Sequence, residues 1–193
     1  MIMSKTKMTG ADYMLMLLYL NQQKPILGAI RLTKMMFLFE KEIAPILKKT
    51  GVEVENLPGF IAYNFGPFSK DVYEQVELFK GIKFIQVTNI RADEEMAEVD
   101  DLEELPFTDE LNNRGYELNA DGKYYKYQIL NTGISFVESE LLPNLTSEQI
   151  EVLEKFKSKI NTLSPKQILK YVYTKYPEYA EKSLIKKEVL DDD

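Results

Sequence analysis

The chain has 193 residues, of which 45% are hydrophobic and 28% charged, an ordinary composition for a globular protein that buries a core. It has no Cys and no His, which excludes disulfides, thiolate nucleophiles, cysteine zinc sites and the Ser-His-Asp and Cys-His mechanisms. The net charge is −7, but residues 92–110 contain ten acidic and no basic side chains, so the remainder carries −7 plus 10, or +3.

Two helices are predicted in the first fifty residues. Thr9 as N-cap, with Asp12 at the third position, indicates a helix start. The apolar run Tyr13–Leu20 in this helix is too short for a membrane span and lacks a small-residue cleavage site after it, so we expect a cytoplasmic protein. A second helix is predicted from Arg31 to Lys48, because its apolar side chains recur at i, i+3 and i+4 spacing.

The segment 61–69 is the most distinctive in the chain. Three aromatic residues flank a Gly66-Pro67 turn, and Ser69 is a good N-cap for a helix that ends near Gly81. The rings either fill the space between this helix and the preceding one, or form a rigid surface for a partner or an anionic group. In the second interpretation the partner-binding residues are Tyr63, Phe65, Gly66, Pro67, Phe68, Ser69 and Tyr73.

The middle of the chain is predicted to contain strands. Alternating apolar residues indicate a strand over Ile82–Ile90, and Asp121-Gly122 predicts the turn of a hairpin over Gly115–Asn131. The acidic strip 92–110 separates the two. It is either a solvated loop or an acidic surface for a basic partner.

Three further helices are predicted after residue 132. The first covers Gly133–Leu142, the second follows a capping box from Thr146 to Gln149, and the third starts at Ser164-Pro165 and ends at Pro177. We therefore expect a single, predominantly helical α+β domain. Its parts would be a winged-helix-like core with a β-hairpin wing (1–142), a C-terminal helical extension (143–187) and a tail (188–193).

The order of three helices followed by paired strands is that of a winged helix, which suggests a DNA-binding regulator. The Ser69–Lys80 helix would then be the recognition helix, but its exposed face holds more acidic than basic residues, which disfavours groove reading. In this alternative function the nucleic-acid contacts are Arg31, Lys34, Lys70, Lys123 and Lys126.

Two segments resemble the paired motifs of a known family. Residues 31–39 (RLTKMMFLF) and 63–73 (YNFGPFSKDVY) are similar to the L-x-K-L-x-[YF] helix and the Y-x-[YF]-G-P-[FV] turn of the Panacea (SocA-like) antitoxin domain and the related YwgA-like proteins. Residues 127–133 resemble the Y-x-L-T-x-x-G end of such domains, and residues 169–183 suit the YwgA-like branch.

The resemblance implies a mostly helical antitoxin or regulatory protein of a bacterial, archaeal or prophage toxin–antitoxin system, which neutralises a toxin partner. We therefore expect a non-enzymatic protein-binding module without a cofactor, metal or membrane contact. The DNA-binding regulator is the alternative. An enzyme that uses Lys, Tyr or carboxylates is a third reading, for which the sequence displays no motif.

Overall fold

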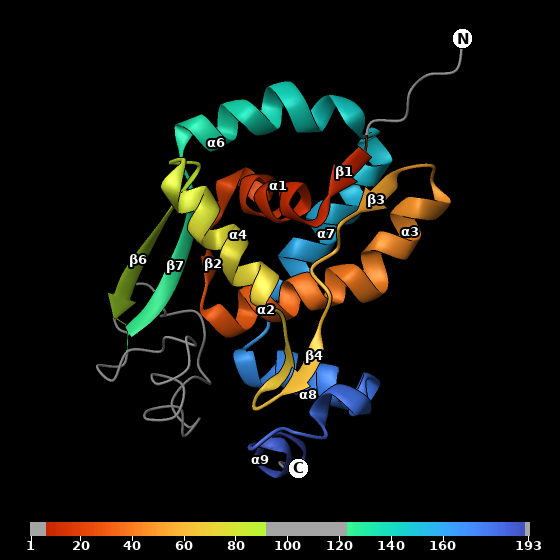
Figure 1. The fold of residues 1–193 in the computed structure, drawn as a ribbon, viewed down its shortest axis with the longest axis vertical. Coiled ribbons are helices and arrows are strands. Elements are labelled where there is room, and N and C mark those ends of the chain that lie inside the picture. Colours follow the sequence, from red (N-terminus) through yellow and green to blue (C-terminus); the bar gives the residue numbers. More distant parts are fainter. Residues whose placement is uncertain (1–6, 92–122, 192–193) are drawn as a thin grey trace.

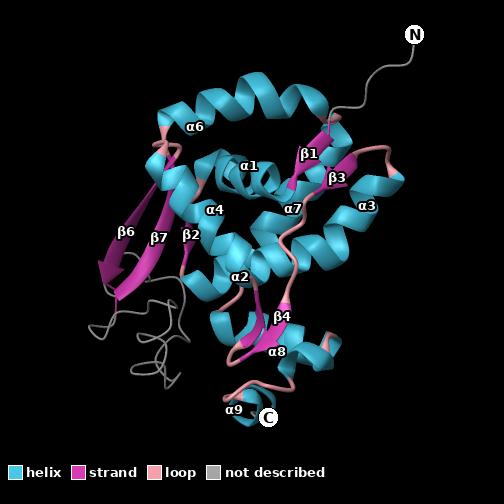
Figure 2. Cartoon of the chain, viewed as in Figure 1, coloured by secondary structure: helices cyan, strands magenta, loops and turns pink. Residues whose placement is uncertain are grey.

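A computed structural model describes residues 7–91 and 123–191 (Figure 1). The fold is α+β and mainly helical, as predicted, and its strands form three small sheets (Figure 2). The acidic strip 92–110 and the predicted Asp121-Gly122 turn lie outside the described residues. Within those ranges, no helix is both long enough and apolar enough to cross a membrane.

Helix α1 (Gly10–Gln23) forms the centre of the hydrophobic core. The predicted N-cap Thr9 is confirmed, and it forms a capping box: the Thr9 hydroxyl accepts from the Asp12 backbone N–H, while the Asp12 carboxylate accepts from the Thr9 backbone N–H. The run from Tyr13 to Leu18 is buried completely. Neighbouring elements cover every side of the helix, which explains why this run is apolar without a helical period.

The predicted Arg31–Lys48 helix is a rod of three parts. Helix α2 (Ala29–Leu38) continues through a π-helical turn, η1 (Phe39–Ile43), into α3 (Ala44–Lys49). All ten residues of α2 are buried, including its charged ones. The predicted apolar stripe is correct, but α2 also buries Arg31 and Lys34, which the helical period assigned to the helix surface. The Lys41 side chain stays 30% exposed.

The strands pair mostly across long sequence distances. The sheets are β1 (Lys7–Thr9) with β3 (Glu53–Glu55), β4 (Ile61–Tyr63) with β5 (Gly66–Phe68), and β2 (Ile26–Leu27) with β7 (Lys123–Ile129) and β6 (Ile85–Arg91). In the third sheet β7 is central. It pairs antiparallel with β6 over its whole length and with β2 at residues 126–127. Among the described residues, the long antiparallel partner of β7 is therefore β6, the strand predicted at 82–90.

Helix α4 (Lys70–Gly81) links β5 to the three-stranded sheet and ends at Gly81, as predicted. Ser69 stands at its N-cap position, but the Ser69 hydroxyl donates 3.1 Å to the Pro58 carbonyl oxygen. This residue therefore anchors the loop before β4. Ser69 therefore has the predicted N-cap position, but its hydroxyl bonds to Pro58 and not to a backbone N–H of α4.

The C-terminal helices add to the core around α1 and α2. Helix α6 (Asn131–Phe136) continues through η3 (Val137–Leu141) and η4 (Leu142–Asn144), and it passes above α1 in Figure 1. Helices α7 (Ser147–Thr162) and α8 (Pro165–Lys175) both start with the predicted capping boxes. They bury side chains such as Leu153 and Leu169 in the same hydrophobic cluster as α1.

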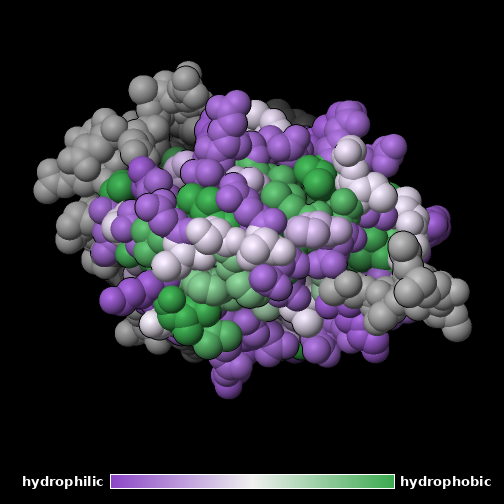
Figure 3. Space-filling view, turned by 90° about the horizontal axis from the view of Figure 1, so that it is seen from above, coloured by the Kyte–Doolittle hydropathy of each residue, from purple (hydrophilic) through white to green (hydrophobic). Residues whose placement is uncertain are grey.

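The chain ends with η5 (Pro177–Ala180) and α9 (Lys186–Leu190). Val189 in α9 is fully buried, so residues 188–190 belong to a packed helix, whereas the sequence predicted a tail from 188 onward. The sequence of the predicted tail has too few apolar residues to show a helical pattern, so it did not indicate that Val189 packs into the hydrophobic core. Over the face seen in Figure 3, apolar side chains appear as patches between polar ones.

Candidate functional site

The β4–β5 hairpin depends on glycine at position 66. Gly66 has a φ of +82°, and a Cβ at this position would lie 2.6 Å from Cε1 of Tyr173 on α8. A side chain would therefore be strained by the backbone and would collide with a packed ring. The register places Ile61 opposite Phe68 and Tyr63 opposite Gly66.

Lys34 of α2 lies beneath this hairpin and forms a hydrogen bond with it. Its side chain is fully buried, and Nζ donates 2.8 Å to the Pro67 carbonyl oxygen. Burial lowers the pKa of Lys34 to about 7, because the charged ammonium is poorly solvated inside the protein. The predicted nucleic-acid contact at Lys34 is therefore an internal group that positions the turn.

Arg31, the second predicted nucleic-acid contact on α2, is also internal. Its guanidinium donates 2.7 Å from Nη1 to the Leu27 carbonyl oxygen and 2.5 Å from Nη2 to that of Leu163, and the residue is 3% exposed. Burial lowers the pKa of Arg31 to about 10. A phosphate group cannot reach a side chain that is enclosed in this way, so the structure removes Arg31 and Lys34 from the nucleic-acid hypothesis.

The other three predicted cationic contacts are on separate elements. Lys70 is exposed at the start of α4, where its ammonium pairs with the Glu74 carboxylate at 2.6 Å. Lys126 is half-buried in β7, and Lys123 is the first residue of that strand. The structure does not gather the five predicted residues into one basic surface in the part of the chain that it describes.

The predicted partner-binding residues divide into a buried and a half-buried group. Phe65 is 5% exposed, and Gly66, Pro67 and Ser69 are buried as well. Tyr63, Phe68 and Tyr73 are half-buried. The burial of the first group agrees with the interpretation that these residues fill space inside the molecule. The predicted space lay between α2 and α4, whereas Gly66 contacts Tyr173 of α8. Only the second group offers side-chain surface to a partner.

Tyr63, Phe68 and Tyr73 form a row of rings. The centroids of Tyr63 and Phe68 are 5.2 Å apart, and those of Phe68 and Tyr73 are 5.7 Å apart. Ile61, opposite Phe68 in the hairpin, shares its face and is 61% exposed. We call these four residues, Ile61, Tyr63, Phe68 and Tyr73, the aromatic surface.

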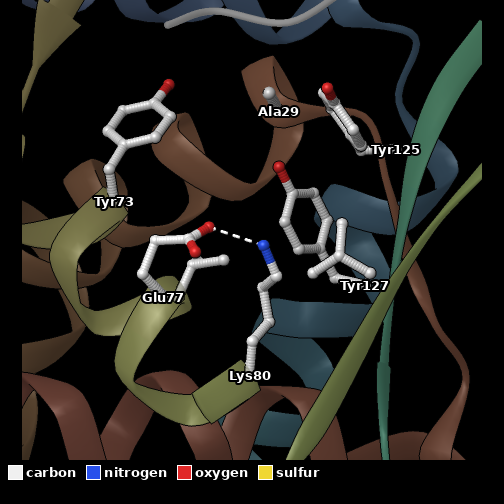
Figure 4. Close-up of a pocket in the computed structure, with 8 residues that line it drawn as sticks. Ala29, Tyr73, Glu77, Lys80, Tyr125 and Tyr127 are labelled. Atoms are coloured by element: carbon white, nitrogen blue, oxygen red, sulfur yellow. Dashed lines mark hydrogen bonds and ion pairs between the residues drawn. The ribbon is translucent and has the colours of Figure 1, made fainter.

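A pocket of about 160 Å³ adjoins the aromatic surface at Tyr73 (Figure 4). Figure 4 shows Tyr73 of α4 on one side and Tyr125 and Tyr127 of β7 on the other, with Lys80 and Glu77 between them. The Lys80 ammonium pairs with the Glu77 carboxylate at 2.7 Å. We call this the tyrosine pocket.

Of the three tyrosines in this pocket, Tyr73 was predicted as a partner-binding residue, whereas Tyr125 and Tyr127 were predicted only as strand residues. Their alternation in 123–129 indicated a strand but contained no information on which helix faces it. The Tyr73 hydroxyl lies 3.3 Å from Thr33 Oγ1, and burial raises the pKa of Tyr73 to about 12, so its phenol stays protonated. The pocket therefore combines aromatic walls with the neutral hydroxyl group of Tyr73.

Comparison with known proteins gives one family. The model described as "Antitoxin SocA-like, Panacea domain" matches residues 32–178, most of the chain. Neither a curated protein nor a solved structure matches the sequence. The matched stretch contains the whole aromatic surface and the tyrosines of the pocket.

Proposed function

The chain belongs to the antitoxin SocA-like family with a Panacea domain, and we propose that it is an antitoxin-like protein that binds and neutralises a protein partner. The observation that carries the proposal is the aromatic surface. Ile61 is 61% exposed beside three half-buried rings, and all four residues lie in the stretch that matches the family. The partner would dock on this surface.

The chemistry of the aromatic surface suits a protein interface. Aromatic side chains are enriched in the cores of such interfaces and supply much of their binding energy. Half-buried aromatic rings of this kind can lose further apolar area to a partner without unfolding of the turn that holds them. The tyrosine pocket next to Tyr73 would receive a side chain of the partner.

The support beneath the aromatic surface favours a preorganised binding site. Lys34 holds the Pro67 carbonyl oxygen at 2.8 Å, and Gly66 lies against the Tyr173 ring. A surface that is already ordered loses little conformational entropy when a partner binds. This supports the proposal that the buried residues of the turn act by positioning the exposed ones.

The proposal is tested by comparing Ile61→Asp with Ile46→Asp. Both isoleucines are exposed, at 61% on β4 and 44% on α3, so neither change should unfold the chain, but only Ile61 belongs to the aromatic surface. The tagged proteins are used for affinity purification from the host at low salt, and the captured proteins are identified. We expect wild type and Ile46→Asp to capture the same partner, and Ile61→Asp to lose at least about tenfold in affinity, because a charge is buried against the partner.

Neutralisation is tested by co-expressing the captured partner with each variant. A partner that stops growth alone, and is relieved by wild type and Ile46→Asp but not by Ile61→Asp, supports an antitoxin-like function. Equal relief by both variants would exclude the aromatic surface as the docking site. A partner that does not affect growth would contradict the neutralising role.

We also propose a winged-helix-like arrangement for the first part of the chain. The chain order α1, β2, α2, α4, β6 and β7, with the sheet order β2-β7-β6, supports it. DNA binding does not follow from this arrangement. Helix α4 would be the recognition helix, yet both Lys70 and Lys80 are paired with glutamates of the same helix.

A further inference from the structure

The three-stranded sheet has an unpaired strand edge at β6. The strand order is β2-β7-β6, so β6 has a neighbouring strand on one side only among the described residues. In Figure 1, β6 is the outermost strand of this sheet, at the left of the molecule. Its pairing with β7 is continuous over seven residues, without a bulge that would bend the strand.

The hydrogen bonds around β7 show which residues of the sheet face which neighbour. Alternate residues of an antiparallel strand direct both of their backbone groups toward the same neighbouring strand. The Leu130 N–H donates to the Phe84 carbonyl oxygen at 2.8 Å, on the β6 side of β7. The Tyr125 carbonyl oxygen accepts at 2.7 Å from the Gly28 N–H, directly after β2, so Tyr125 faces the other side. The even-numbered residues of β7 therefore bond to β6.

The register transfers this alternation to β6. Even-numbered residues of β6 lie opposite even-numbered residues of β7, as Gln86 does opposite Gln128, so they bond to β7. The odd-numbered residues Ile85, Val87 and Asn89 then direct their backbone N–H and C=O groups away from β7. Among residues 7–91 and 123–191, these backbone groups have no hydrogen-bond partner in another element. We call the outward backbone groups of Ile85, Val87 and Asn89 the β6 edge.

The β6 edge is complementary to the backbone of another extended chain. Its donors and acceptors repeat at every second residue, about 7 Å apart, which is the spacing along any β-strand. Proteins usually protect an open edge with charged side chains, proline or a bulge. Residues 85–90 (IQVTNI) contain no charged residue and no proline. The edge therefore lacks the features that would prevent a further strand from pairing with it.

The β6 edge is continuous with the surfaces described above. Val87 lines the tyrosine pocket together with Tyr73, and Tyr73 also belongs to the aromatic surface. A strand added to β6 would lie about 5 Å beyond it, so its side chains on the α4 face would lie next to Val87 and the pocket. One partner protein can therefore contact the edge, the pocket and the aromatic surface together.

The charge of the chain favours a different protein over a second copy at this edge. Pairing of two β6 edges would bring together two chains that each carry a net charge of −7, and these chains repel each other. The same charge attracts a protein of opposite sign. The occupant that fits both the backbone pattern and the charge is an extended segment of a positively charged protein.

We propose that the β6 edge binds an extended segment of a positively charged partner protein, which adds to the sheet as a fourth strand beside β6. Main-chain hydrogen bonds provide the affinity in this mode of recognition, and alternate side chains provide the specificity. That the segment belongs to the neutralised partner rests on the proposed function. The availability of the edge for a strand does not.

The probe for this site is the basic peptide Ac-KTVTVTK-NH2, titrated into the full-length ¹⁵N-labelled protein and followed by NMR. We expect saturable shifts and slower hydrogen exchange of the Ile85, Val87 and Asn89 backbone amides. The same peptide with N-methyl groups on its three central residues keeps its side chains and charge but loses backbone donors. It should bind at least about fivefold more weakly. The acidic peptide Ac-ETVTVTE-NH2 should also bind more weakly than the basic one.

A matched pair of variants at Asn89 tests the edge from the side of the protein. Asn89→Pro removes one outward N–H and leaves the bonds between β6 and β7 in place, since proline is tolerated at this position of an edge strand. It should weaken peptide binding at least about fivefold. Asn89→Ala removes the exposed side chain but keeps the N–H, so it should bind like wild type. Slow exchange of the Gln86 and Thr88 amides in Asn89→Pro checks that β6 still pairs with β7.

Several outcomes would overturn the proposal. They are shifts that do not saturate, equal binding of the N-methylated or the acidic peptide, and wild-type binding by a folded Asn89→Pro protein. A wild-type dimer in sedimentation that Asn89→Pro dissociates would assign the edge to a second copy. If the basic peptide binds as expected but Ile61→Asp does not affect partner capture, the β6 edge is supported and the aromatic surface is contradicted. If capture behaves as expected but the peptide does not bind, only this inference is wrong.

Discussion

Buried cations are the unusual feature of this protein at the scale of single residues. Arg31, Lys34 and Lys157 are almost completely enclosed, and each donates hydrogen bonds to backbone carbonyl oxygens. The Lys157 ammonium lies 2.6 Å from the Leu20 carbonyl oxygen and 2.7 Å from that of Lys24. It therefore stabilises the end of α1, where the carbonyl groups of a helix carry a partial negative charge.

Lys34→Met tests the charge state of the buried lysine. The pKa of Lys34 is about 7 in the folded protein and 10.5 in a solvated chain, so the unfolded state binds more protons between these values. The free energy of unfolding of wild type should then rise from pH 7 to pH 9, and that of Lys34→Met should rise less. Urea unfolding at both pH values measures the difference. Parallel changes in the two proteins would mean that Lys34 does not titrate in this range.

Phe65→Ala and Phe68→Ala separate packing from binding within one turn. Phe65 is 5% exposed, so its truncation should cost about 3 kcal/mol or more of unfolding free energy. Phe68 is half-buried in the aromatic surface, so Phe68→Ala should cost clearly less and reduce partner capture. Denaturant unfolding and affinity purification of both variants measure the two effects. A reversed order of stability would contradict the assignment of Phe65 to the core.

At the scale of elements, the β4–β5 hairpin joins parts of the chain that are far apart in sequence. It is bonded to Lys34 of α2 and packed on Tyr173 of α8, and the Leu184 backbone N–H donates 2.9 Å to the Asn64 carbonyl oxygen. Any change in the turn is therefore transmitted to the C-terminal helices. This explains why a short hairpin, marginal in isolation, is ordered here.

A comparison of Gly66→Ala with Gly59→Ala measures the contact between Gly66 and the Tyr173 ring. Both glycines have positive φ, of +82° and +64°, so alanine is strained by about 1–2 kcal/mol at either position. Only at Gly66 does the new methyl group also collide with the Tyr173 ring. We expect Gly66→Ala to lose about 1–3 kcal/mol more than Gly59→Ala in thermal or denaturant unfolding. Equal losses would show that the ring moves aside without cost.

At the scale of the whole molecule, one hydrophobic cluster extends from Met8 to Val189. The side chains of Ile168, Leu169 and Val172 on α8 are fully buried in it. The predicted division into a core of 1–142 and an extension of 143–187 is therefore not visible in the packing. We propose that the chain is a single cooperative unit.

Removal of residues 163–193 tests this unity. The truncated chain loses α8 and α9 and exposes the surface of α2 that α8 covers, so it should not unfold cooperatively. A shorter deletion, of residues 191–193, removes only residues after α9 and should leave the melting temperature unchanged. Calorimetry of both proteins provides the comparison. A cooperative transition of the 1–162 chain near the wild-type temperature would contradict the single cooperative unit.

Features that depend on neighbours a few residues away could be predicted from the sequence. The predicted N-cap at Thr9 and the predicted capping boxes at Thr146 and Ser164 are present, because their donors and acceptors lie within one helical turn. The π-helical turn η1 was not predicted, but the helix around it was. The family was identified from two short motifs, whose residues form the hairpin and the helix beneath it.

Which of these residues face outward depends on the packing of distant elements. Lys34 and Lys70 are alike in sequence terms, yet one is enclosed beneath Pro67 and the other is in solvent. Phe65 and Phe68 differ in the same way, because the turn at Gly66 directs one toward the core and leaves the other half-exposed. Burial depends on elements that are far apart along the chain, such as α2 and α8. The local pattern around a residue contains no information about those partners.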